Sequence, residues 1–405
     1  MEAALFLQET LVLDQLLYAA GALLSRGRRK NAAEGVDVDT HRRFGEVRAF
    51  TDEWRALEAR ACGAATAFQA CDFHLVWARH FCDERTELRL VTVRRQGRLV
   101  LLWPLAISAT PFGRVASWAG DPVGQYGDVV AEDAPGRDDW IEAAFLEIAG
   151  WGDVDFLNLR GVRADGAIAR WAAWRGRVIG PAAEAPALDH SAYETAADFI
   201  EAGWPEAKRN AKRMKKLRAQ GKVGFEIVQP GPRAVELMRT AFSFKRQWLE
   251  RRGHYGRAFI DGRVENCLME LAADGGGSGL VVTHLSVGGE TAAIEVGFRQ
   301  RGCHYAYMGA FSPAFAKQSP GFVATELTIR ACIEDGLGEY DPLPPADDYK
   351  LAWSNRRVAV RDYGVVLSWR GYTACAFALA RPAAKAIYAR LPLKVRQGLR
   401  LSSVK

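Results

Sequence analysis

The chain has 405 residues, of which 49% are hydrophobic and 25% are charged, and its formal net charge at pH 7 is +6. These proportions are those of an ordinary globular protein, long enough for two cores at roughly 150 residues per domain, and they exclude a largely disordered chain. The basic residues are bunched at 26–30, 208–222 and 381–405, which favours local anionic partners over a protein that coats nucleic acid along its whole surface.

The N-terminal segment 5–24 is rich in Leu and Ala, and basic residues follow it at 26–30. Glu9 and Asp14 interrupt the apolar run, which argues against a transmembrane span and against a signal peptide. Two interpretations stay open. The segment is either an amphipathic helix that lies on an anionic membrane surface or a terminal helix that covers an apolar surface of the protein. We assign residues 1–45 to this helix and a basic linker.

The sequence has seven cysteines, an odd number, and no two of them are spaced as C-x-x-C. Scattered cysteines predict a reducing compartment, hence a cytoplasmic protein, and argue against a disulfide framework and against a zinc site. Cys303 and Cys332 fall in apolar segments, where a small buried hydrophobic residue is the favoured interpretation. No metal is expected.

From Thr51 the hydrophobic pattern alternates between helical and strand spacing. A Gln96-Gly97 pair between two apolar runs predicts a hairpin, and two glycines end the helix that follows it. The predicted elements are helices at 53–61 and 73–81, strands at 88–93 and 99–107, a helix at 140–148 and a strand at 154–159.

The same order returns later in the chain. A hairpin at 279–298 leads to a Pro-Gly pair, a helix, two glycines and a strand that contains an aspartate. Pro135-Gly136 precedes Asp155 by nearly the distance that separates Pro320-Gly321 from Asp341. We interpret the two stretches as two copies of one α/β module, with chance similarity as the alternative.

Between the modules, residues 181–186 are interpreted as a turn-rich connector, and a strongly basic helix is predicted at 204–222. A solvated helix face is the ordinary explanation for such a run of charge. The functional interpretation is a platform for a polyanion, whether RNA, a lipid headgroup or an acidic glycan. Further helices are predicted at 236–252 and 259–271, and residues 371–405 form a basic helical tail.

The stretch from Gly302 to Trp353 predicts a βαβ unit: a strand at 303–311, a helix at 321–334 and a strand at 339–343. Ser319, Pro320 and Gly321 suit a helix start, because Ser is a good N-cap, Pro fits the first position and Gly admits another molecule to the backbone. Such a start presents N–H groups and the positive end of the helix dipole, which favours phosphate, although an ordinary helix cap is the alternative.

The corresponding Pro-Gly in the first copy is surrounded by acidic residues at 132, 133, 138 and 139, which repel phosphate. The second copy has Lys317 there and no acidic residue until Glu326. We therefore expect cofactor binding in the second copy.

Several of these segments resemble the CelD/BcsL-type acetyltransferases, a group of the GNAT-like superfamily related to the FemAB-type aminoacyl transferases. The resemblance is carried by KRNAKRMKKLRAQGKVGFE in the basic helix, KRQWLERRG at 245–253, SPGF at 319–322 and EYDPLPPADDYKLAW at 339–353. It is strongest over 204–369 and looser over 47–178, where YGD stands at 126–128. Pro342 and Pro345 depart from the family pattern and stiffen the loop before Tyr349.

The fold implied by the resemblance is α/β (α+β), with two tandem GNAT-like modules, each a mixed, mostly antiparallel sheet flanked by helices. Residues 46–180 would be a degenerate first module and residues 190–370 the catalytic acetyltransferase module. The implied co-substrate is acetyl-CoA. The strand that contains Tyr307 and Met308 would expose backbone N–H groups to the pantetheine arm, and a cradle for the pyrophosphate would be formed by Lys317, Ser319, Pro320, Gly321, Phe322 and Val323.

Three residues are the candidates for the chemistry. Tyr349 stands where related enzymes often place a tyrosine that protonates the departing thiolate. Asp341 is the candidate base or substrate-orienting group, and capping of the following loop is its alternative role. Lys350 is expected either to hold a carboxylate or phosphate of the substrate or to pair with a neighbouring aspartate on the surface.

Other candidates for the base rank below Asp341. His284 and His304 would face each other across neighbouring strands, although a lone strand histidine is more often structural. Glu295 lies on the strand before the expected cofactor strand.

Three functions follow from these observations. The first is acetyl transfer from acetyl-CoA to a hydroxyl or amine of a small-molecule or glycan acceptor, linked to cellulose or exopolysaccharide synthesis. The second is a FemAB-like transfer from aminoacyl-tRNA, and of the three hypotheses it is the one that predicts a nucleic-acid partner. The third is a non-catalytic accessory protein of polysaccharide export. The expected location is the cytoplasm, with peripheral contact at the inner face of an anionic membrane as an extension.

Overall fold

A computed structural model describes residues 35–42, 44–61, 66–252, 259, 261–274 and 276–390. The helix predicted at 5–24 and the end of the basic tail after residue 390 lie outside the described residues. Within them, the six described cysteines are free, and Cys303 and Cys332 are buried as predicted.

The first half forms the elements that the hydrophobic pattern predicts, together with strands that the pattern did not reveal. The hairpin turns at Gln96 and Gly97, whose φ values of 52° and 75° are those the predicted turn requires. The elements are β1 (Val36–His41), α2 (Phe44–Ala49), α3 (Thr51–Arg60), η1 (Ala67–Gln69), α4 (Cys71–Phe81), β2 (Thr86–Arg95), β3 (Arg98–Thr110), β4 (Gly113–Trp118), β5 (Val130–Ala131), α5 (Arg137–Ala149), β6 (Phe156–Arg163), α6 (Ala169–Arg175), β7 (Arg177–Val178) and β8 (Ala183–Asp189).

The second half repeats this order after two further helices. Its strand β12 has the predicted bounds, and the helix after it begins at Pro320, as the Pro-Gly signal indicates. The elements are α7 (Ala196–Glu201), α8 (Pro205–Arg218), β9 (Val223–Val228), α9 (Pro232–Arg252), α11 (Gly262–Ala273), η2 (Gly276–Ser278), β10 (Leu280–Val287), β11 (Glu290–Gln300), β12 (Cys303–Phe311), η3 (Pro313–Gln318), α12 (Pro320–Glu334), β13 (Glu339–Asp341), α13 (Asp348–Leu351), β14 (Arg356–Val366) and α14 (Gly371–Arg390).

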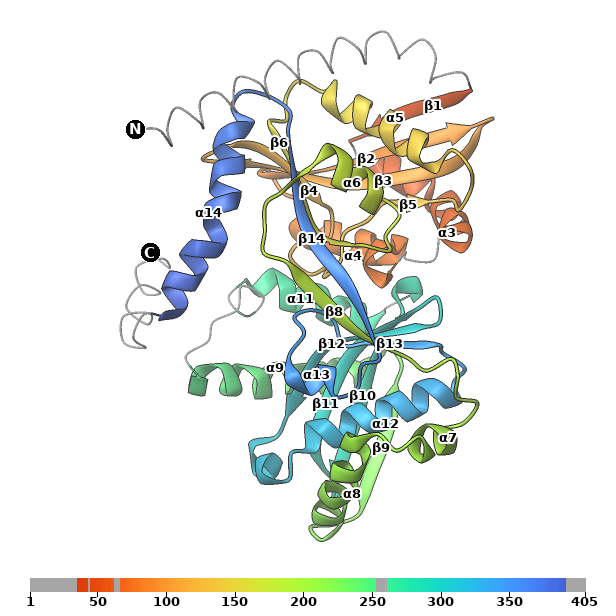
Figure 1. Ribbon diagram of the computed structural model, residues 1–405, viewed down its shortest axis with the longest axis vertical. Helices are drawn as coiled ribbons and strands as arrows, with labels where there is room; N and C mark the ends of the chain where they lie inside the picture. The colour runs from red at the N-terminus through yellow and green to blue at the C-terminus, as the bar shows by residue number, and fades with distance from the viewer. Residues whose placement is uncertain are drawn as a thin grey trace.

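The two halves share one strand topology (Figure 1). In the first half β2, β3 and β4 pair antiparallel, and β4 pairs in parallel with β6, the strand after α5. In the second half β10, β11 and β12 pair antiparallel, and β12 pairs in parallel with β13, the strand after α12. The predicted fold, two copies of a mostly antiparallel α/β module, is therefore confirmed.

Strands β8 and β14 join the two halves into one sheet, of order β1-β2-β3-β4-β6-β14-β8-β13-β12-β11-β10-β9. Strand β8 follows first-half elements but pairs with β13, whereas β14 follows second-half elements but pairs with β6. The two strands also pair with each other. The prediction of a turn-rich connector at 181–186 is wrong, because most of that segment is strand β8, held by ladders on both sides. The module boundaries at 180 and 190 stay a prediction.

Helices cover both faces of the sheet. Helix α5 packs on one face of the first half and α12 on one face of the second half, whereas α3, α4, α9 and α11 share a single core on the opposite face. That shared core contains Trp54, Phe73, Leu268 and Tyr305, so it belongs to both halves. Each fully buried large apolar side chain contributes about 1.5–3 kcal/mol to the free energy of folding. The shared core therefore stabilises the positions of β12 and β13, next to which the candidate site lies.

Helix α14 is the described part of the predicted basic tail, and it packs against β4, β6 and β14. Some of its apolar side chains remain in solvent, among them Phe377 and Ile387, which are 51% and 63% exposed. Across the described part of the chain, no helix combines the length and the apolar character needed to cross a membrane.

Candidate active site

Strands β12 and β13 pair over a short stretch only. Their parallel pairing extends from Cys303 opposite Glu339 to Tyr305 opposite Asp341. Strand β13 ends there, whereas β12 continues to Phe311 and has no further strand partner on that side within the described residues. A register shift between β11 and β12 occurs just beyond the last paired residue. The end of this pairing lies within the strand predicted to bind the cofactor, and its use for binding stays a prediction.

Helix α12 starts beside the end of β12. Pro320 is its first residue and is buried, but a Cβ on Gly321 would meet only Phe311 Cδ1, at 4.0 Å. The helix start is thus open on the side of Gly321, where a phosphate group can approach the backbone. Ser319 stands at the N-cap position with φ 53°, and its side chain makes no capping hydrogen bond, so the prediction that this hydroxyl caps the helix is wrong. The left-handed backbone conformation of Ser319 turns its hydroxyl away from the first N–H groups of the helix.

The next residues of α12 are braced by α8. Phe322 O accepts a hydrogen bond of 2.8 Å from Asn210 Nδ2, and the guanidinium of Arg213 lies 4.3 Å from the centre of the Phe322 ring. Val323 is buried in the core between the two helices. Lys317 is exposed on η3, just before the helix start. Of the residues predicted to cradle a pyrophosphate, Lys317 and Gly321 are therefore open, and Pro320 and Val323 are packed.

Tyr349 lies at the same opening. Its ring is 49% exposed and meets the Phe322 ring edge to face, with 6.3 Å between the ring centres. Partial burial and the charges of Asp347 and Glu295 raise the pKa of Tyr349 to about 12. The phenol is therefore protonated at neutral pH, the state that a proton donor requires.

Two lysines donate hydrogen bonds to backbone carbonyls just beyond the pairing of β12 with β13. Lys245 Nζ of α9 lies 3.1 Å from Gly309 O on β12, and Lys350 Nζ of α13 lies 2.8 Å from Leu343 O, just after β13. Burial lowers the pKa of both amines, although Asp347 and Asp341 oppose this in Lys350. Among the described residues, neither amine has a carboxylate within ion-pair distance. Lys350 is only 8% exposed, so the alternative of a surface pair with a neighbouring aspartate is wrong.

Asp341 is fully buried between the two halves. Its carboxylate accepts hydrogen bonds from Tyr126 Oη at 3.0 Å, from Arg163 Nη1 at 2.6 Å and from Leu343 N at 2.7 Å. Burial raises the pKa of Asp341, although the Arg163 charge and the hydrogen bonds oppose it. The bond to Leu343 is the predicted loop cap, and the pair with Arg163 ties β13 to β6. Its role as a base stays a prediction.

A second buried cluster lies on the α12 face of the sheet. Glu295 accepts a hydrogen bond of 2.8 Å from Tyr340 Oη and contacts His304 Nε2 at 3.1 Å. Burial disfavours a charged His304, but its contacts with Cys332 and Glu295 outweigh this and raise the pKa of His304 to about 9. His304 is therefore a charged partner of Glu295 at neutral pH, a poor state for a base.

The expectation that His284 and His304 face each other is wrong. His284 lies on β10 and contacts Glu226 and Thr291, whereas His304 lies on β12, with β11 between the two strands. Strand order and register are not encoded in the local spacing of the two histidines, so this separation could not be predicted from the sequence.

The matching position in the first half is filled. Where β4 and β6 part, Trp118 Nε1 donates a hydrogen bond of 2.9 Å to Arg160 O. The indole is packed so closely that a Cβ on Gly127 would stand 1.9 Å from its nitrogen. Helix α5 also carries Asp138 and Asp139 in its first turn. Space and charge both favour the second half for an anionic cofactor.

A groove runs from helix α14 toward the second half. It consists of two adjoining cavities of about 660 and 350 Å³. Asp121, Arg160 and Asp362 lie at their junction, where Arg160 pairs with both aspartates at 3.5 and 3.8 Å. The smaller cavity reaches Tyr126 and Pro344. Pro344 follows Leu343, whose carbonyl oxygen accepts the Lys350 hydrogen bond.

Sequence reasoning missed Lys245, Arg163 and the groove residues. Lys245 was visible as the first residue of the KRQWLERRG segment but was given no role, and Arg163 lies beyond the strand predicted at 154–159. Their partners stand 64 and 178 positions away in the chain, so no local spacing announces these contacts. Of the YGD motif, Asp128 accepts hydrogen bonds from the backbone N–H groups of Val129, Ala167 and Ile168, a structural role.

No group of three or more His, Cys, Asp or Glu side chains among the described residues is placed to hold a metal ion. The residues near the end of the β12–β13 pairing instead offer amines, a phenol and a helix start. These groups fit an anionic, phosphate-bearing ligand.

Residues 206–351 match the family model described as an acetyltransferase (GNAT) domain. The matched segment runs from α8 to the end of α13 and so contains β12, β13, both lysines and Tyr349. The chain thus contains a GNAT-like domain, which supports an acyltransferase. No curated protein matches the chain in sequence.

Solved structures share the fold across both halves. The crystal structure of FemX aligns with a TM-score of 0.55 at 11% identity, covering 78% of this chain and 96% of FemX. The C-terminal domain of a putative lysylphosphatidylglycerol synthetase from Agrobacterium fabrum aligns with a TM-score of 0.51 at 10% identity, covering 83% of this chain and 96% of that domain. At such identities the similarity concerns the fold alone.

Proposed function

We propose that this protein transfers an acetyl group from acetyl-CoA to a hydroxyl or amine of a sugar or polysaccharide precursor, in the synthesis of cellulose or another exopolysaccharide. The observation that carries the proposal is the part of β12 that extends beyond its pairing with β13, together with the open start of α12. A strand that has lost its partner offers unpaired backbone groups to an extended ligand, and an open helix start offers N–H groups to phosphate.

The residues near the end of the β12–β13 pairing fit acetyl-CoA, which when bound supplies the activated acyl group. Gly321 and Lys317 would hold its pyrophosphate. Lys245 and Lys350 would stabilise negative charge on the thioester oxygen, since each amine donates a hydrogen bond to a backbone carbonyl near this pairing and lacks a carboxylate partner among the described residues. Tyr349, protonated at neutral pH, would give its proton to the leaving sulfur.

The acceptor would occupy the groove beneath α14. Its polar centre carries Asp121 and Asp362, which pair with Arg160, and Arg381 also lines both cavities, so the local charge is nearly balanced. Such a lining suits the many hydroxyl groups of a sugar better than it suits a highly charged ligand. The groove reaches Pro344, next to Leu343, whose carbonyl accepts the Lys350 hydrogen bond, so a bound sugar would extend toward Lys350.

Calorimetry with CoA and acetyl-CoA tests the first step of this proposal, and micromolar affinity is expected. Release of free CoA thiol from acetyl-CoA in the presence of sugar acceptors tests the second. Mass spectrometry of glycans from cells with and without the gene identifies the acceptor. Absence of binding to either CoA form would overturn the proposal.

Aminoacyl transfer from tRNA is the alternative, favoured by the exposed cations of α8, whose described surface includes Lys208, Lys212, Lys215 and Lys216. It predicts tRNA binding that falls steeply with salt and no binding of CoA. If neither ligand binds, a non-catalytic accessory role is left.

A further inference from the structure

Helix α8 presents a face of cations that no carboxylate neutralises. Arg209 and Arg213 pair with Glu206 on the packed side of the helix. The other cations of α8, and Lys222 just after it, are exposed, and none has a carboxylate within ion-pair distance among the described residues: Lys208, Lys212, Lys215, Lys216, Arg218 and Lys222. The opposite side of α8 is fixed on α12 by Leu217, which is fully buried, so the charged face is directed outward.

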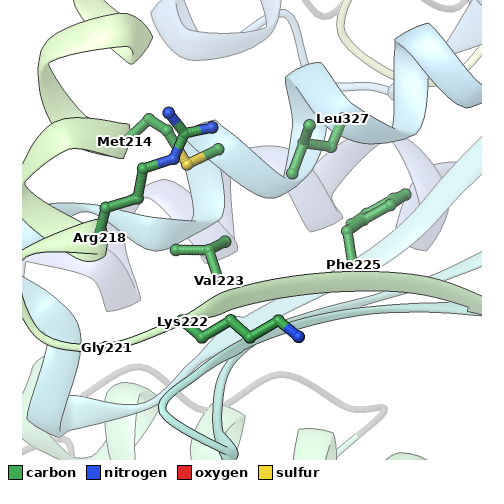
Figure 2. A pocket seen from close by; sticks show the side chains of 7 residues that line it. All are labelled: Met214, Arg218, Gly221, Lys222, Val223, Phe225 and Leu327. Carbon is green, nitrogen blue, oxygen red and sulfur yellow. The ribbon is translucent and has the colours of Figure 1, made fainter.

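A cavity of about 480 Å³ lies at the C-terminal end of this face. Figure 2 shows Met214 and Arg218 from α8 on one side, Val223 and Phe225 from β9 on the other, and Leu327 from α12 at the back. Strand β9 is the edge of the sheet, and α8 lies at one end of the molecule, so the cavity opens at the periphery (Figure 1).

The wall of the cavity is fixed by close backbone packing. Gly221, which connects α8 to β9, has φ 155°, and a Cβ there would stand 2.8 Å from the backbone of Gly288 in the β10–β11 turn. Only glycine permits this approach. The distance between Met214 and Val223 across the cavity is therefore set by the fold.

We propose that α8 and this cavity dock the protein on an anionic phospholipid membrane, with one acyl chain in the cavity. The four apolar side chains of the cavity would hold the chain, and Arg218 and Lys222 would hold the phosphate of the same lipid. The outward cations would face the headgroups of neighbouring lipids.

A membrane explains the combination of features better than RNA does. Cations alone serve both partners, but an apolar cavity beside them suits an acyl chain. Sites for single-stranded RNA instead stack bases on exposed aromatic rings, and among the described residues that line the cavity only Phe225 is aromatic. The cavity and the outward cations include none of the residues proposed to bind acetyl-CoA, so the inference does not rest on the proposed chemistry.

Flotation of the full-length protein with phosphatidylcholine vesicles that contain about one third phosphatidylglycerol tests the proposal. Binding is expected to these vesicles and not to pure phosphatidylcholine. Lys215→Gln with Lys216→Gln should weaken it about 25-fold, at about fivefold per cation near the surface. The matched control is Arg239→Gln with Arg251→Gln on α9, which removes the same charge on the other face of the sheet and should change binding less than twofold.

The cavity has its own variant. The double substitution Met214→Gln with Phe225→Thr leaves the charge of the protein unchanged. It should lower the vesicle affinity that persists at high salt about tenfold. Thermal unfolding checks that each variant is folded, and CoA affinity, measured on the same samples, should not move. Three results would each overturn the proposal. The first is no binding to either kind of vesicle, and the second is an equal loss of vesicle binding in the double-lysine variant and the double-arginine control. The third is unchanged vesicle binding of the cavity variant together with binding of tRNA.

Discussion

Replacing Gly321 by Asp should have opposite effects on folding and on CoA binding. The new side chain has room, because a Cβ would meet only Phe311 Cδ1 at 4.0 Å. A carboxylate in the first turn of α12 interacts favourably with the helix dipole, by about 0.3–1 kcal/mol, and loss of glycine stiffens the unfolded chain. The apo variant should therefore melt at the same temperature as the native protein or slightly above it.

The effect on CoA follows from charge. A carboxylate and a phosphate about 6 Å apart repel by about 3 kcal/mol at an effective dielectric constant of about 20. That energy corresponds to a loss of affinity of about 100-fold. The loss should shrink as salt is added, because the Debye length is about 10 Å at 0.1 M ionic strength.

Calorimetric titration with CoA at low and high salt measures the affinity, and scanning calorimetry measures the melting temperature. Gly321→Asn is the matched control, because it has the size of Asp without the charge. If the Asn variant binds as weakly as the Asp variant, bulk and not charge is responsible. If the Asp variant binds CoA as tightly as the native protein does, no phosphate sits at the start of α12.

Three further predictions concern the chemistry and the buried charges. Tyr349→Phe should lower turnover by about 10²-fold or more and leave CoA affinity unchanged, and steady-state kinetics with calorimetry check both; full turnover would remove the phenol from the mechanism. Because contacts with Cys332 and Glu295 raise the pKa of His304 to about 9, protonation of His304 stabilises the fold by up to about 3 kcal/mol at pH 6.5 and below, and this stabilisation is lost as pH rises through 9; urea unfolding of His304→Gln should lack that pH dependence. Asp341→Asn should destabilise the protein by about 3 kcal/mol, since it leaves Arg163 buried with one carboxylate fewer; an inactive variant with native stability would make Asp341 catalytic instead.

Local patterns in the sequence determined the elements of the site. The apolar run at 303–311, the Pro-Gly after it and the glycines that end the helix each act within a few residues, through strand propensity, backbone φ and helix termination. They therefore located β12, α12 and β13 closely, and the repeat of the same signals around Pro135 revealed the second copy.

Contacts between distant residues were decided only by the tertiary structure. Strand β8 pairs with β13 of the second half, and β14 pairs with β6 of the first half. These pairings depend on which sheet edges come together in the folded protein, and the sequence of a single strand does not specify that. The burial of Asp341 against Arg163 and the amine of Lys245 on Gly309 O depend on that assembly in turn. An exposed loop carboxylate and a buried ion pair look alike in a sequence, because desolvation is a property of the surroundings and not of the residue.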